Sequence, residues 1–146
     1  MNTFQLDQKL SDVSGFIGAY PYDGLPNKPP GDFSIIINTD SKSGAGDHWL
    51  ALVRKESVFY FHDSYGRHLD DELFTVTFKN TMRNYIDERC IFNSKWIQQI
   101  ISNVCGFHSL YFISEMENKD FRVVLSVFTD NLKNNDDFVV KYANSL

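Results

Sequence analysis

Short apolar runs rich in β-branched and aromatic residues alternate with polar turns through the first two thirds of the chain. The run FSIII predicts a buried strand at residues 33–37. Residues 48–53 and 58–61 predict two more strands, and the polar residues 54–57 between them predict a hairpin-like turn. Shorter strands are predicted at residues 90–92 and 96–97.

Apolar residues at helical spacing dominate elsewhere. The acidic residues 70–72 suit a helix N-terminus, so we expect a helix from there to about Ile86. Residues 20–31 contain all four prolines and are expected to be irregular, and residues 41–47 are expected to form a loop. Further helices are predicted at residues 4–13, 105–116, 121–132 and 137–142.

The order of these elements predicts an α+β fold in which helices flank a mostly antiparallel central sheet. A length of 146 residues fits a single domain, residues 1–146. A net charge of -5 argues against generic binding to nucleic acid, and no apolar run approaches the roughly 20 residues of a membrane span. The start of the chain lacks the pattern of a signal peptide, and only two cysteines are present, so a reducing, intracellular setting is expected.

Cys105 and Gly106 stand where a polar turn becomes an apolar helix. A thiol at a helix N-terminus faces unpaired N–H groups and the positive end of the helix dipole, which favour the thiolate. The same N–H groups could hold the negative oxygen of a tetrahedral intermediate. The alternative is a small buried thiol beside a packing glycine.

A nucleophilic cysteine needs a base, and His48 opens a predicted strand at the rim of the sheet. Asp63 ends the next strand, so a hairpin would bring the two side chains to the same end of the sheet and let Asp63 fix the histidine tautomer. Strand alternation places Asp63 on the face of Phe59 and Phe61. The alternatives are an edge histidine without a role and an aspartate that caps the following turn. Gln98 or Gln99, before the cysteine, could donate an amide N–H to the oxyanion.

These pieces resemble the adenovirus-type (adenain-like) maturation proteases, in the clan of cysteine peptidases that includes SUMO and other ubiquitin-like-specific proteases. The likeness is carried by GDHWLAL at residues 46–52, FYFHDSYG at residues 59–66 and QxxxxxxCG at residues 98–106, in the clan's order His, Asp, Gln, Cys. IINTD at residues 36–40 and DGLP at residues 23–26 are similar, more narrowly, to the proteases of Maverick/Polinton elements and virophages.

The resemblance implies a cysteine endopeptidase with Cys105 as nucleophile, His48 as general base and then acid, and Asp63 as the group that orients the imidazolium. Gln98, seven residues before the cysteine, has the adenovirus-type spacing and is preferred over Gln99, six before, which has the SUMO-protease spacing. Asp47, Trp49 and Gly106 are expected to contact the substrate, with Trp49 and the Cys105 loop selecting small residues, often glycine, before the cut.

The resemblance also implies capsid protein precursors as substrates, in the host cell cytoplasm or a viral factory, with the enzyme packaged in the virion. Cys90 resembles a cysteine that bonds an activating viral peptide; the alternative is a half-buried strand thiol. A DNA cofactor is not expected because the chain is acidic, and no metal is expected because zinc-ligand spacing is absent. The alternative functions are a deubiquitinase or SUMO-type isopeptidase and an inactive binding module.

Overall fold

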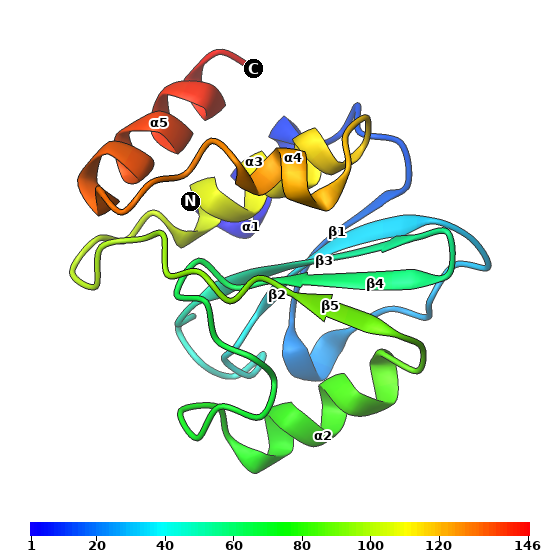
Figure 1. Cartoon of the computed structure of the whole chain (residues 1–146). Coiled ribbons are helices and arrows are strands. Elements are labelled where there is room, and N and C mark those ends of the chain that lie inside the picture. The colour runs from blue at the N-terminus through cyan, green and yellow to red at the C-terminus, as the bar shows by residue number, and fades with distance from the viewer.

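A computed structural model, which describes all 146 residues, is built on one five-stranded sheet with the strand order β1-β2-β3-β4-β5 (Figure 1). The outer pairs, β1–β2 and β4–β5, are parallel, and the inner pairs, β2–β3 and β3–β4, are antiparallel. The strands are β1 (Phe16–Pro21), β2 (Phe33–Asn38), β3 (Trp49–Lys55), β4 (Val58–His62) and β5 (Cys90–Phe92).

The expectation of a mostly antiparallel sheet was therefore wrong for the outer strands, and the sheet is mixed. A two-residue turn reverses the chain between β3 and β4, whereas long connections precede β2, β3 and β5. A long connection can carry the chain back across the sheet, so that the next strand runs parallel to its neighbour. The connection from β1 to β2 includes a short 3-10 helix, Tyr22–Gly24.

Helices cover both faces of the sheet (Figure 1). The central helix α3 packs on β3, with α1, α4 and α5 on the same side, whereas α2 covers the other face. Two separate apolar clusters fill these interfaces, one beneath α3 and one beneath α2. The helices are α1 (Thr3–Lys9), α2 (Val76–Tyr85), α3 (Cys105–Met116), α4 (Phe121–Leu125) and α5 (Leu132–Asn144).

Several element boundaries differ from the predicted ones because hydrogen-bonding caps decide where helices begin. Thr75 accepts from the Phe78 N–H at 3.1 Å, so α2 starts at Val76 and not at the acidic residues 70–72. Asn131 caps α5 in the same way, with the Asn134 N–H at 3.0 Å, so the last helix begins at Leu132 and not near residue 137. The helix predicted at residues 121–132 ends at Leu125. The predicted strand at residues 96–97 lies in the loop from β5 to α3.

The strand β1 was missed because its last residue, Pro21, lies in the proline-rich segment. A proline cannot donate to a sheet ladder and is tolerated at a strand end or edge, and β1 is an edge strand. The central helix Cys105–Met116, by contrast, has the predicted bounds.

The hairpin between β3 and β4 determines the relative positions of His48 and Asp63. Glu56 and Ser57 have positive φ angles of 53° and 65°, as a two-residue type I′ turn requires. In the resulting register Ala51 pairs with His62, so the start of β3 and the end of β4 lie at the same end of the sheet.

Candidate active site

Cys105 is the first residue of α3, and its side chain points at the start of β3. The sulfur accepts a hydrogen bond from the Trp49 N–H at 3.4 Å, and Cys105 is 9% exposed. No side chain caps α3, and the earliest bond of the helix runs from the His108 N–H to the Val104 carbonyl. The N–H groups of the first turn are therefore free of helical partners and place positive charge beside the sulfur.

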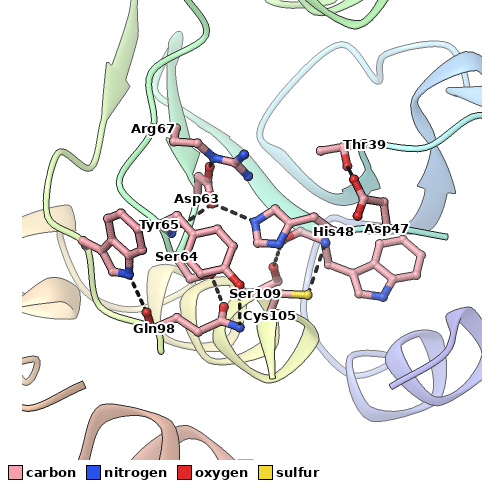
Figure 2. Close-up of polar contacts among 12 residues, drawn as sticks. Thr39, Asp47, His48, Asp63, Ser64, Tyr65, Arg67, Gln98, Cys105 and Ser109 are labelled. Atoms are coloured by element: carbon pink, nitrogen blue, oxygen red, sulfur yellow. Dashed lines mark hydrogen bonds and ion pairs between the residues drawn. The ribbon is translucent and has the colours of Figure 1, made fainter. Parts of the chain in front are cut away.

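His48 and Asp63 form a buried pair next to this cysteine (Figure 2). His48 directly precedes β3 and Asp63 directly follows β4, and the distance from His48 Nε2 to Asp63 Oδ1 is 2.7 Å. His48 is 7% exposed and Asp63 is fully buried. The Tyr65 ring stacks on the His48 ring with centroids 4.8 Å apart and planes 14° apart. The hairpin thus brings together the two residues that the sequence predicts as base and orienting acid.

Two further groups bind the Asp63 carboxylate, and a third holds its backbone. Arg67 Nε donates to Oδ2 at 2.6 Å, on another side of the carboxylate from His48 (Figure 2), and the Tyr65 N–H donates to Oδ1 at 3.0 Å. Asn93 fixes the backbone of Asp63, accepting from its N–H at 2.9 Å and donating to its carbonyl at 2.7 Å. A buried carboxylate with these partners stays ionised and rotationally fixed.

The pKa values of the three side chains shift toward a thiolate–imidazolium pair. Burial by itself lowers the pKa of His48, but hydrogen bonds to Asp63 and Cys105 and the negative charges of both outweigh it and raise the pKa to about 9. Burial likewise would raise the pKa of Cys105, but the hydrogen bond and positive charge of His48, with the N–H groups of Trp49 and Gly106, lower it below its usual range. Burial opposes ionisation of Asp63 too, and its bonds and charge interactions with His48 and Arg67 lower its pKa.

A cleft of about 580 Å³ opens in front of Cys105 and His48. Asp47 and Trp49, which are predicted to contact the substrate, line this cleft, and the Trp49 Nε1–H donates to the Met1 carbonyl at 3.2 Å. Gly106 does not line the cleft. A Cβ atom on Gly106 would lie 3.3 Å from Trp49 Cδ1 and 3.4 Å from Met1 Cβ, so this glycine makes room for the cleft wall.

Gln98 lies fully buried in the loop from β5 to α3. Its amide Nε2 donates to the Ser102 carbonyl at 3.1 Å and to the Tyr65 hydroxyl at 3.4 Å, and its Oε1 accepts from the Ser64 hydroxyl. These bonds hold the amide beside the cysteine loop, outside the residues that line the cleft. The backbone N–H of Gln99 donates to Asp136 at 3.3 Å. The choice of Gln98 as oxyanion donor stays a prediction.

Cys90 lies in β5, away from this site. It is half-buried, and burial raises the pKa of its thiol to about 12. Cys90 and Cys105 are both free thiols. No group of three or more His, Cys, Asp or Glu side chains is arranged to hold a metal ion. None of the helices has the length and apolarity needed to cross a membrane.

No protein-family model and no curated protein matches this sequence. The structure is similar to the crystal structure of the Se-Met ASFV pS273R protease, with a TM-score of 0.56 and 14% sequence identity. The likeness covers 95% of this chain and 66% of that chain, so this chain spans just under two thirds of the length of that protease. The two proteins share a fold.

The structure also adds functional candidates that sequence reasoning missed. Arg67 and Asn93 anchor Asp63, and Tyr65 stacks on His48 and contacts the Gln98 amide. Arg67 could have been suspected from its spacing, four residues after Asp63 in the same turn. Asn93 gives no such signal, because its contact with Asp63 spans 30 residues of chain.

Proposed function

We propose that this protein is a cysteine endopeptidase. The observation that carries the proposal is the arrangement at one end of the cleft. Asp63 binds His48 at 2.7 Å, Cys105 Sγ accepts a hydrogen bond from the N–H of the next residue, Trp49, at 3.4 Å, and the positive charge of His48 helps to lower the pKa of Cys105. A structural thiol in an apolar core would show the opposite shift, as Cys90 does. The shared fold with a protease supports the same proposal.

In the proposed mechanism the Cys105 thiolate attacks the carbonyl carbon of a peptide bond and forms a C–S bond. The carbonyl oxygen becomes an oxyanion, which the Cys105 N–H at the uncapped start of α3 stabilises. The His48 imidazolium then gives its proton to the leaving nitrogen as the C–N bond breaks, which leaves a thioester. Neutral His48 takes a proton from water, the hydroxide attacks the thioester, and the thiolate and a carboxylic acid product separate.

Gln98 is proposed as the second oxyanion donor. Its amide lies on the loop that leads to Cys105, which supports the assignment, but Nε2 now donates to Ser102 and Tyr65. The role therefore requires Ser102 to release one N–H as substrate binds. Catalytic hydrogen bonds are often formed only in the substrate complex.

We further propose that the enzyme cleaves after small residues such as glycine. Its substrates would be capsid or other structural protein precursors, which it cuts during virion maturation. It would act in the host cytoplasm or viral factory and be packaged in the virion. The resemblance of the sequence motifs to maturation proteases supports this substrate class. Trp49, fixed to the Met1 carbonyl at one wall of the cleft, supports the steric selection of small side chains. The same resemblance leads us to propose that Cys90 forms a disulfide with an activating peptide.

The test is cleavage of a proteome-derived peptide library by wild type and by Cys105→Ala. We expect cuts from wild type only, with small residues enriched just before them. Fusions of ubiquitin and SUMO form a second arm, and their preferred hydrolysis would favour the isopeptidase alternative. Equal cleavage by the alanine variant, or none by wild type, would reject the proposed function.

A further inference from the structure

The loop from β5 to α3 carries three exposed apolar side chains. Trp96 is 45% exposed, Ile100 is 70% exposed and Ile101 is 93% exposed. We refer to these three residues as the loop patch. Loops usually carry polar residues at such positions, and adjacent exposed isoleucines are therefore a feature that folding does not require.

Polar contacts hold this loop in one position. The Ile97 and Gln98 N–H groups both donate to the Ser64 carbonyl, at 2.9 and 3.2 Å. The Gln99 N–H donates to Asp136 Oδ2 at 3.3 Å, and Asp136 Oδ1 pairs with His108 of α3 at 2.9 Å. The loop is thus bonded to the turn that follows β4 and to α5, and through Asp136 to α3, so the isoleucines are exposed on a fixed support.

The loop patch continues the wall of the candidate active-site cleft. Ser102 directly follows Ile101 and lines the cleft, as does Tyr65. Tyr65 also joins the two regions: its ring stacks on His48 and lies 5.5 Å from the Trp96 ring, and its hydroxyl donates to the Ile100 carbonyl at 3.4 Å. Figure 2 shows the Tyr65 ring between His48 and the Gln98 segment.

A polypeptide that lies extended across Cys105 must leave the cleft at one of its ends. An extended chain rises about 3.3 Å per residue, and alternate side chains point to the same face. A chain that leaves past Ser102 and Tyr65 therefore presents side chains to the loop patch within a few residues of the cut bond. Apolar side chains would be stabilised there by burial against Trp96 and the isoleucines.

We propose that the loop patch is a docking surface for an apolar side chain of the polypeptide substrate, at one fixed position on one side of the cut. The inference rests on the proposed endopeptidase function and adds a specificity determinant outside the catalytic residues. The occupant is the chain being cleaved, because the patch begins where the cleft wall ends and the substrate is the molecule that must cross that boundary.

The experiment compares the cuts that wild type, Ile100→Ser/Ile101→Ser and single Ile101→Ser make in one proteome-derived peptide library. Wild type should show enrichment of Leu, Ile, Met or Phe at one position, and both variants should lose it while small residues stay enriched next to the cut. For a peptide with the preferred apolar residue, kcat/KM should fall about tenfold in the double variant, since burying one such side chain contributes roughly that factor or more. The fall should be small for the matched peptide with alanine there.

Leu73→Ser/Val76→Ser is the matched control, because these residues are 78% and 72% exposed near α2, on the other face of the sheet. It should cut like wild type, and thermal unfolding of each variant shows whether the fold is kept.

Apolar enrichment that persists in the patch variants, or that is absent from wild type, would overturn the docking surface alone. If the patch variants lose self-association while their cleavage is unchanged, the docking surface for substrate would also be overturned. The loop patch would then be a contact surface for a second copy of the chain. A wild type that cuts nothing would overturn the proposed function and the docking surface with it.

Discussion

Replacing Asp63 by Asn tests whether the buried carboxylate sustains the thiolate–imidazolium pair. The substitution keeps the size of the side chain but removes the negative charge that His48 Nε2 meets at 2.7 Å. The rise of the His48 pKa from 6.5 to about 9 corresponds to about 3 kcal/mol in favour of the imidazolium, which Asp63 and Cys105 share. A charge-assisted hydrogen bond contributes about 1.5–3 kcal/mol, so the loss of Asp63 should raise the pH at which Cys105 ionises by about 1–2 units.

The assay is the rate of alkylation of Cys105 by iodoacetamide as a function of pH, which reports the thiolate whether or not the protein cleaves peptides. Cys90→Ser serves as the background, so that only one thiol reacts. Asp70→Asn is the matched control, because Asp70 is an exposed carboxylate that pairs with Arg83 and lies outside the site. A curve for Asp63→Asn that coincides with that of the control would refute the argument that Asp63 supports the ion pair.

Three further predictions follow from the same geometry. Arg67→Met removes the 2.6 Å bond to Asp63, so the pKa of that carboxyl should rise and kcat/KM at pH 6 should fall about tenfold or more. Arg67→Lys is the control and should retain part of the activity. Activity should decline as pH rises through about 9, because His48 then loses the proton that it gives to the leaving amine in the proposed mechanism; a basic limb near pH 7 would contradict the raised pKa. Ser57→Gly should stabilise the protein by about 1 kcal/mol in urea unfolding, since Ser57 has a φ of 65° that glycine adopts without strain, and a lower midpoint would contradict this reading of the turn.

The central hairpin was predictable from the sequence because its information is local. Two apolar strands separated by a short polar turn pair with each other in antiparallel register, and that register sets which strand ends meet. The proximity of His48 and Asp63 follows directly from the hairpin. The start of α3 at Cys105 was equally predictable, since an apolar run follows a polar turn there.

The outer strands were not predictable in the same way. The sequence between β1 and β2, or between β4 and β5, does not state on which side of the sheet the chain returns. That choice depends on which apolar face each connecting segment buries, and α2 buries Phe78 and Met82 against the face opposite α3. Parallel pairing at both edges is the consequence, and only the packed structure reveals it.

The sequence by itself determined the residue types of the candidate site and their order along the chain. His48, Asp63 and Cys105 were placed well because each adjoins the end of a locally specified strand or helix, whereas Gln98 lies in a loop. The tertiary structure decided what surrounds them. Asn93 is hydrogen-bonded to the backbone of Asp63, the Tyr65 ring stacks on His48, and the Gln98 amide donates to the Ser102 carbonyl. Burial, charge and hydrogen bonding at such contacts depend on segments that only the complete fold brings together. The pKa values of Cys105 and His48 are set by that environment and not by the motif that contains them.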